Sequence, residues 1–484
     1  MKLLVRGGIV VSPGGRREAD VLCDGGRIEA VVEPGEEVHA DDMIDAKGLL
    51  VFPGFIDPHI HPRDPGDTHN EDFAHASRAA AVGGVTTLLV MPNAVPPVTD
   101  VASFRRRAQE HGVVAHVDFG LWGLSLGVAN IGDLAGLFAA GAVAVKLFWG
   151  YALDKESKRL VYNAADRAPQ DVIPPASTGE VYEIFRAVAA ADGILAAHCE
   201  DRDILEAAQR QLGHAPQAYA ELAAARPDVA ESSSVAVGIE LARASGCRFH
   251  VCHISSARAT HLVRLAQRDG LAVTAETCPH YLLFVAADCA GRDAAMKAYP
   301  PVRAVADREA LWAAVDDGTI TSLGSDHAPH TLADKSQPFA TAPAGMVAVE
   351  TMAPLLLDRM NAGRITPERL SWALSEGTAR LYGLYPRKGA VVAGADADLT
   401  LVDPSATWTI RGDELHSVQK HTPLEGTVVR GMPVKTVLRG ALVAEGREPV
   451  GESSGRLVIR PSRPQDSRAA AAAGSAGDSS RGAP

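Results

Sequence analysis

The stretch Asp57-Pro58-His59-Ile60-His61-Pro62-Arg63-Asp64 follows a largely apolar run at residues 49–56. In a β-strand, side chains two residues apart point to the same side, so His59 and His61 would face one point in space. Zinc and similar ions accept imidazole nitrogens at about 2.0–2.1 Å, so the pair can supply two metal ligands. Taken alone, it is equally typical of an ordinary polar strand end, and the rest of the chain must decide.

The composition is that of a soluble globular protein with enough apolar residues for a large core. Of its 484 residues, 22% are charged and 46% are hydrophobic. This length suits either two or three average domains or one α/β barrel with insertions. The formal net charge of −12 disfavours nucleic acid or an anionic membrane as the main partner, although a few local basic groups can still bind an anionic substrate.

The N-terminal residues and the cysteines favour a cytoplasmic location. Met1–Arg6 leads into two glycines rather than a long apolar segment, so we expect neither a signal peptide nor a transmembrane span. The six cysteines have no CxxC spacing, which is typical of reduced thiols rather than a disulfide framework.

The middle of the chain alternates between short apolar runs and Ala-rich helical stretches. Eight parallel strands separated by helices are what a (β/α)8 TIM barrel requires, whereas a doubly wound sheet lacks support because no G-x-G-x-x-G turn follows the first strand. The predicted helices include Phe73–Ala81, Thr178–Ala191, Val235–Ser245 and Ala257–Arg268. The predicted strands are Leu50–Asp57, Val85–Met91, Val114–Leu121, Ala142–Leu147, Ile194–His198, Arg248–His253, Ala272–Glu276 and Ile320–Ser325.

Both ends of the chain contain short β-rich runs separated by Gly and Pro turns. We therefore expect residues 1–50 and 385–460 to form one small β-sandwich domain that flanks an α/β barrel at residues 51–384. Residues 461–484 are rich in Ala, Ser and Gly and poor in large apolar groups, so we expect a disordered tail.

The predicted strands end in polar residues that can bind metals. In TIM barrels the functional groups gather at the carboxyl ends of the strands. Each residue alone also fits a plain polar strand end, but six of them at five strand ends are hard to explain in that way. They are His59, His61, Lys146, His198, His253 and Asp326.

Lys146 is the most informative of these residues, because it lies in the apolar run Ala142–Trp149. Burying an unpaired ammonium is costly. Beside two divalent ions the amine could lose its proton and react with carbon dioxide, giving a carbamate whose two oxygens bridge both metals. The alternative is a lysine that reaches solvent or pairs with an acid.

With these residues assembled, the chain resembles the amidohydrolase superfamily, in particular the cyclic amidases: dihydroorotases, allantoinases and hydantoinases. The motifs are GFIDPHIHPRDPG, EDFAHASRAAAVGGVTT, MPNAVPPVTD, SDHAPHTLADK and GMVAVETMAPLLL, within about residues 54–426. The resemblance implies that His59, His61 and Asp326 hold one metal, that His198 and His253 hold a second, and that carboxylated Lys146 bridges them. Zinc is the expected metal, although such ligands also accept manganese or cobalt.

The resemblance also implies substrate contacts. In dihydroorotases the carboxylate of the substrate is held by residues that match Arg63, Asn93 and His330 here. Each also fits an ordinary role, as a surface ion pair, a turn cap and a loop histidine. Tyr151, five residues past Lys146, is typical of hydantoinases, in which the tyrosine binds the ring or its transition state.

Two stretches depart from the dihydroorotase pattern. ETCPHYL at residues 276–282 is more similar to allantoinases and hydantoinases, and Tyr299 stands where many bacterial dihydroorotases have asparagine. Residues 152–177 belong to no recognised motif. They form either a lid that selects substrates or a passive surface insertion.

The resulting functional prediction is a dihydroorotase of pyrimidine biosynthesis, which reversibly hydrolyses dihydroorotate to N-carbamoyl-aspartate. Asp326 is the expected catalytic residue, taking a proton from a metal-bridging water and delivering it to the leaving nitrogen. An allantoinase or a hydantoinase/dihydropyrimidinase-type amidase is the alternative, and a non-catalytic scaffold is a remote one. Family resemblance also implies a homo-oligomer.

Overall fold

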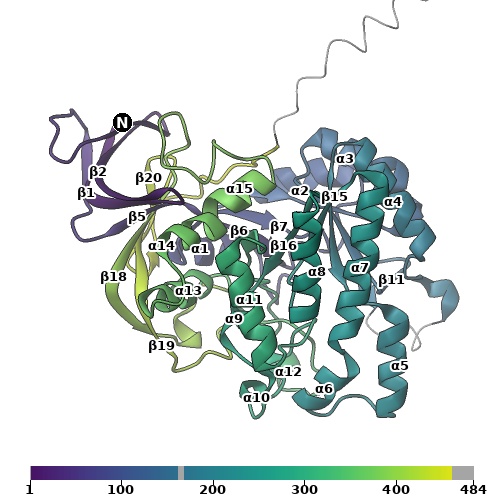
Figure 1. The fold of residues 1–484 in the computed structure, drawn as a ribbon. Coiled ribbons are helices and arrows are strands. Elements are labelled where there is room, and N and C mark those ends of the chain that lie inside the picture. Colours follow the sequence, from purple (N-terminus) through teal and green to yellow (C-terminus); the bar gives the residue numbers. More distant parts are fainter. Residues whose placement is uncertain (1, 162–167, 461–484) are drawn as a thin grey trace, which may run out of the picture.

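The computed structural model describes residues 2–161 and 168–460. It has a mixed α/β fold in which a β-sheet lies beside a ring of parallel strands enclosed by helices (Figure 1). The tail predicted at residues 461–484 lies outside the described residues. No helix in the described ranges is long and apolar enough to cross a membrane.

Strands from both ends of the chain form one sheet, seen in Figure 1 where purple and yellow-green strands lie side by side. β5 joins the two ends, because it pairs in parallel with β1 and antiparallel with β18. Within the described residues, the strands are β1 (Leu3–Ser12), β2 (Gly15–Asp24), β3 (Arg27–Val32), β4 (Asp42–Asp45), β5 (Leu50–Pro53), β18 (Leu399–Thr409), β19 (Val428–Leu438), β20 (Ala441–Glu445) and β21 (Glu448–Pro449).

The prediction that the first barrel strand begins at Leu50 is wrong. Residues 50–53 belong to the terminal sheet, and the barrel strand β6 begins at Phe55. The chain passes between the two at Gly54, where a side chain would collide with that of Thr86. Both strands are fully buried, so one continuous apolar run contains strands of two different sheets. The apolar pattern therefore does not mark where β5 ends and β6 begins.

The parallel strands follow the predicted order and close into a barrel. β16 pairs with β17 in parallel, and a parallel bridge between Ile60 and His327 closes the ring beyond β17. Trp122 interrupts the third strand position, which is split into β8 and β9. Along the described chain the barrel strands are β6 (Phe55–Ile60), β7 (Val85–Val90), β8 (Asp118–Leu121) with β9 (Gly123–Leu124), β10 (Val145–Trp149), β14 (Ile194–Cys199), β15 (Arg248–Val251), β16 (Val273–Thr277) and β17 (Ser322–Leu323).

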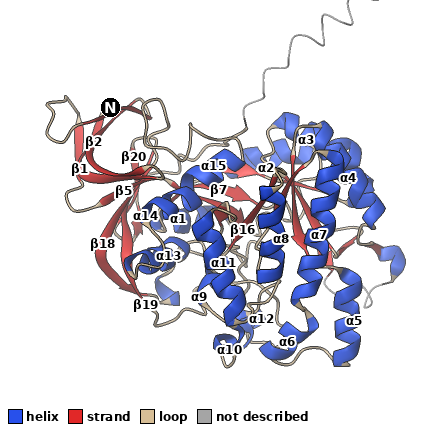
Figure 2. Cartoon of the chain, viewed as in Figure 1, coloured by secondary structure: helices blue, strands red, loops and turns tan. Residues whose placement is uncertain are grey.

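Helices pack around the outside of the barrel (Figure 2). The predicted helices are confirmed to within a residue or two at most ends, except that α7 begins seven residues earlier than predicted. The main helices described are α1 (Phe73–Val82), α2 (Val101–Val114), α3 (Leu134–Ala140), α4 (Thr178–Ala190), α5 (Arg202–Leu212), α6 (Tyr219–Ala225), α7 (Asp228–Ser245), α8 (Ala257–Arg268), α11 (Val305–Asp317) and α13 (Met352–Asn361). Shorter ones are α9 (Pro279–Leu283), α10 (Ala286–Cys289), α12 (Leu332–Lys335), α14 (Pro367–Ser371) and α15 (Gly377–Leu381).

Side-chain caps fix where several helices begin. Asp72 accepts a hydrogen bond from the backbone of His75 at the start of α1, and Ser177 and Glu180 form a reciprocal capping box on α4. The end of α2 corrects a second prediction, because Val114 lies in this helix and the following strand begins only at Asp118. The apolar run continues from helix into strand without a breaking residue, so its pattern does not mark the change.

Candidate active site

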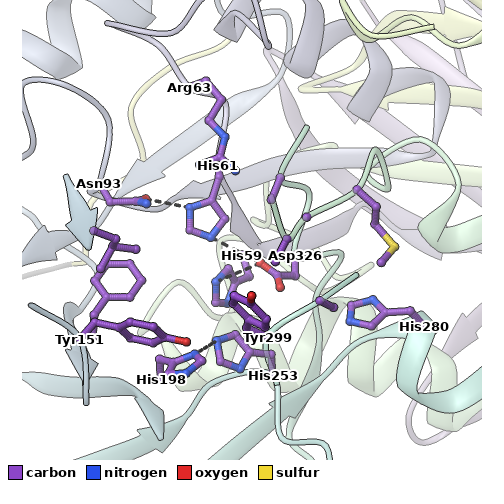
Figure 3. A pocket seen from close by; sticks show the side chains of 17 residues that line it. His59, His61, Arg63, Asn93, Tyr151, His198, His253, His280, Tyr299 and Asp326 are labelled. Carbon is purple, nitrogen blue, oxygen red and sulfur yellow. Dashed lines mark hydrogen bonds and ion pairs between the residues drawn. The ribbon is translucent and has the colours of Figure 1, made fainter. Parts of the chain in front are cut away.

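Five of the six predicted metal ligands, His59, His61, His198, His253 and Asp326, converge beyond the carboxyl ends of the barrel strands (Figure 3). Asp326 Oδ1 lies 3.4 Å from His61 Nε2 and 3.6 Å from His59 Nε2. His198 Nδ1 lies 3.3 Å from His253 Nε2. Two ligands of one tetrahedral zinc ion, each about 2.1 Å from it, are separated by roughly 3.4 Å, so both groups have the spacing that a shared ion requires.

Lys146 lies in β10, where its backbone pairs with Leu124 and Ala196, and its charge acts on His59, His198 and His253. The residue is completely buried, and its Nζ has no hydrogen-bond partner among the described residues. An ammonium in this position would be unpaired, which is costly. The environment therefore fits a modified, metal-bound lysine better than a free one, since a carbamate would supply anionic oxygens to ions held by the histidines.

Polar neighbours hold three of the histidines in a fixed orientation. Each neighbour bonds to one ring nitrogen and leaves the other directed at the metal-ligand cluster, an arrangement that is common around protein-bound metals. His61 Nδ1 donates to Asn93 Oδ1 at 2.7 Å, and His198 Nε2 donates to Glu200 Oε2 at 2.8 Å. His59 Nδ1 bonds to Glu276 in the same way.

Burial keeps most of these imidazoles neutral, as metal ligands must be. It lowers the pKa of His61 to about 4 and takes that of His253 well below its usual value. His59 differs: burial lowers its pKa, but the charge of Glu276 together with hydrogen bonds to Glu276 and Cys252 outweighs burial and raises the pKa to about 10. A metal ion on Nε2 would displace that proton.

Asp326 is ionised at neutral pH. Burial alone would raise its pKa, but the neighbouring His61, His59 and His280 together outweigh burial and hold the pKa below its usual value. The side chain is also the most exposed of the acids in the cluster, at 16%. It can therefore reach a substrate while it remains beside the histidines.

The pocket above the cluster contains most of the predicted substrate contacts. Arg63, Asn93 and Tyr151 line it, whereas His330 lies behind Arg63. The Nε2 atom of His330 is 3.3 Å from the Arg63 guanidinium and 3.0 Å from the carbonyl oxygen of Ala344. His330 therefore supports Arg63 from behind and does not form part of the pocket wall.

Part of the 152–177 segment reaches this pocket. The segment contains β11 (Ala152–Asp154), β12 (Leu160–Val161) and β13 (Val172–Ile173), which form a small antiparallel sheet, and Leu160 lines the pocket. Arg159 binds Asp67 in the loop after β6 at 2.8 Å. Residues 162–167 lie outside the described residues.

The backbone is strained at several of these positions. Among the described non-glycine residues with positive φ are Arg63 (59°), His253 (35°) and Asp326 (49°). Such conformations cost free energy and gather at functional sites, where the surrounding structure enforces them. The strain supports the assignment of this cluster independently of its side chains.

Sequence reasoning missed several residues of the site. Glu276 ends a predicted strand and so satisfied the rule that identified the histidines, while His280 lies in the quoted motif ETCPHYL but was assigned no role. His280 and Tyr299 both line the pocket. No sequence pattern pointed to Arg226 as a site residue, because it follows α6 and lies at no predicted strand end and in no recognised motif.

Known proteins resemble the whole of this chain. It is 38% identical to an allantoinase from Rubrobacter xylanophilus over 96% of this chain and 99% of that protein. It is 33% identical to a dihydroorotase from Listeria welshimeri, over 92% and 98%. The solved structure of an L-hydantoinase from Arthrobacter aurescens matches with a TM-score of 0.88 and 32% identity, covering 95% of this chain and 99% of that one. A model of the Amidohydrolase family matches residues 50–443, and the chain belongs to that family.

Proposed function

We propose that this protein is a metal-dependent hydrolase that opens the ring of a small cyclic amide or ureide. The completely buried Lys146 carries the proposal, because its Nζ has no hydrogen-bond partner among the described residues although its charge is close enough to act on His59, His198 and His253. The relatives of this protein include proteins named allantoinase, L-hydantoinase and dihydroorotase. A cytoplasmic location and a homo-oligomeric state remain predictions from the sequence.

The residues that would hold two divalent ions are His59, His61, His198, His253, Asp326 and Lys146 as a carbamate. Zinc is the first candidate. Ions bound there would lower the pKa of a shared water from 15.7 towards about 7 and polarise the amide carbonyl. The chain itself holds the histidine ligands in a fixed orientation, chiefly through hydrogen bonds to Glu276, Asn93 and Glu200.

Asp326 is proposed to carry the proton. Its carboxylate is ionised and close to His59 and His61, so it can accept a proton from the attacking water. Water oxygen then bonds to the carbonyl carbon, the ring C–N bond breaks, and the proton passes from Asp326 to the leaving nitrogen. Tyr151 would donate a hydrogen bond to the carbonyl oxygen, on which negative charge develops.

Dihydroorotate is the first substrate candidate, with N-carbamoyl-aspartate as its product. Arg63 lines the pocket with its guanidinium backed by His330, and a planar fork of this kind matches a carboxylate. Burial, aided by the charge of Arg63, lowers the pKa of His330 to about 3, so that the imidazole is neutral and adds no second cation.

Allantoin, a neutral ureide, is the second candidate. The relative at 38% identity is named allantoinase. The Oδ1 atom of Asn93 is engaged by His61, which leaves only its amide nitrogen to meet a substrate. That nitrogen can donate a hydrogen bond to a ureide carbonyl oxygen.

A direct comparison of dihydroorotate, allantoin and hydantoins with one metal-loaded preparation tests the proposal. Arg63→Ala should lower kcat/KM for dihydroorotate about 10–100-fold, since charge-assisted hydrogen bonds contribute about 1.5–3 kcal/mol. Arg243→Ala, which removes an exposed pair with Asp269 outside the pocket, is the control. Normal turnover of dihydroorotate by Arg63→Ala would reject the assignment of Arg63 to the substrate carboxylate. Purified protein that retains no metal and opens no ring would favour the non-catalytic scaffold.

A further inference from the structure

Arg226 joins two parts of the site that the proposed function treats separately. It follows α6, and its side chain is only 11% exposed. The guanidinium binds both oxygens of Glu200, with Nε 3.2 Å from Oε1 and Nη2 bonded to Oε2. Nη2 also donates to the hydroxyl oxygen of Tyr151.

One of these contacts leads to the metal ligands. Glu200 accepts the Nε2 hydrogen of His198, and His198 turns its other nitrogen towards His253. The other contact leads to the pocket, where the ring of Tyr151 packs edge-on against that of His198 at a centroid distance of 4.9 Å. Arg226 therefore contacts the Tyr151 hydroxyl directly and reaches the predicted metal ligand His198 through Glu200.

The local chain brings these groups together. Gly150 has a φ of +93°, and a side chain there would collide with the carbonyl oxygen of Glu200. The end of β10 can thus lie against the segment after β14, which places Tyr151 beside Glu200. On the other side, Arg303 donates to the carbonyl oxygen of Arg226 at 2.9 Å and holds its backbone.

The chemistry of the contact requires an arginine. A guanidinium has five N–H donors in one plane, so it can bind a carboxylate and a hydroxyl at the same time, whereas lysine has a single ammonium on a flexible stem. Because the Tyr151 oxygen accepts a hydrogen bond from Arg226, its own hydrogen must point away from Arg226. Figure 3 shows this hydroxyl directed into the pocket, beside Tyr299 and the histidines.

Tyr299 completes the arrangement. Its ring centroid lies 3.9 Å from the guanidinium carbon of Arg226, within the range of a cation–π contact. This is the tyrosine that departs from the dihydroorotase pattern, and it also lines the pocket. The departure therefore has a structural role, because the tyrosine covers the guanidinium that holds Tyr151.

We propose that Arg226 is a positioning residue that couples the orientation of the metal ligand His198 to the hydrogen-bond donor Tyr151. It thereby keeps the hydroxyl and the metal cluster at a fixed separation, so that both can act on one carbonyl group. This inference rests on the proposed function, in which Tyr151 and the metals act on the same ring amide.

A double-mutant cycle tests the coupling. Arg226→Lys and Tyr151→Phe should each lower kcat about 10–100-fold on whichever ring substrate is turned over, with KM changed less than threefold. The double variant should lose less than the product of the two single losses, because both changes break the same contact between Arg226 and Tyr151. Arg369→Lys is the control, since this half-buried arginine donates to the backbone carbonyls of Val315 and Ile320, which do not line the pocket, and should leave kcat unchanged. Fully multiplicative losses would overturn the proposal.

A second readout does not depend on turnover. Protein loaded with Co²⁺ should keep its full metal content in Arg226→Lys, but its visible absorption should shift, because His198 loses part of its support. Glu200→Gln should produce the same shift and weaken metal binding about 10–100-fold. Unchanged spectra in both variants would overturn the coupling even if ring opening is confirmed. If wild type opens no ring but the absorption of both variants shifts as expected, only the proposed function is rejected.

Discussion

Lys146 and Lys388 are both buried, with exposed fractions of 0% and 2%, yet their surroundings are opposite. Lys388 Nζ lies 2.6 Å from Asp118, 3.0 Å from Asp396 and 2.5 Å from Asp398. Lys146 Nζ has no hydrogen-bond partner in the described parts of the chain. Burial of a lysine therefore does not indicate function by itself, whereas burial without a partner does.

The two lysines also lie at opposite ends of the barrel. Asp118 is the first residue of β8, while Lys146 pairs with Leu124, roughly 20 Å further along the same strand position. The amino ends of barrel strands serve stability and the carboxyl ends serve function. Asp118, Asp396 and Asp398 have the spacing of a metal site, but Lys388, Arg387 and Arg439 already pair with them.

The largest effect should follow from removing the paired lysine. Burial lowers the pKa of Lys388, but the surrounding aspartates outweigh it and raise the pKa above its usual value. Lys388→Met should therefore lower the free energy of unfolding by about 3–5 kcal/mol, because buried carboxylates lose their counter-charge. Urea unfolding measures the loss, with the exposed Lys47→Met as the control. A loss below about 1 kcal/mol would show that the cluster does not depend on Lys388.

The same substitution at Lys146 should have the opposite sign. In metal-free protein, Lys146→Met removes an unpaired buried amine and should raise the free energy of unfolding by about 1–3 kcal/mol. The variant should also fail to retain two metals and should have no activity. Urea unfolding in the presence of a chelator and elemental analysis of purified protein measure these changes. Full metal occupancy, or a loss of stability as large as that at Lys388, would contradict the metal-bridging role.

The sequence predicted the residues that gather at the carboxyl end of the barrel far better than those at the opposite end. His198 and Asp326 were found because strand ends are recognisable locally and a barrel brings such ends together. The pairing of Lys388 with Asp118 spans 270 residues and depends on how the terminal sheet meets the barrel, which no local pattern reports. Arg226 was missed for the same reason, since its partners come from other parts of the chain. Leu50 was misplaced because strands of two different sheets are buried in one apolar run.

A third lysine, Lys335, is intermediate between these two, because its ammonium donates to backbone carbonyls and forms no ion pair with any described residue. It is 7% exposed and donates to the carbonyl oxygens of Pro343 at 3.0 Å and of Gly345, in the pocket wall, at 2.7 Å. Burial, aided by the charge of Lys297, lowers its pKa to about 7. The two carbonyl contacts thus offset only part of the cost of burying the charged amine.

The pH dependence of stability should reveal this partial compensation. Between pH 7 and about 10.5 the unfolded chain keeps a proton on Lys335 that the folded protein has lost, so the free energy of unfolding should rise with pH across this window and level off outside it. From pH 7 to 9, wild type should gain about 1–2 kcal/mol relative to Lys335→Met, after allowance for water near the site. Lys297 is present in both proteins, so the difference in urea unfolding isolates Lys335. Parallel pH profiles would mean that the carbonyls of the pocket wall satisfy the ammonium as fully as aspartates satisfy Lys388.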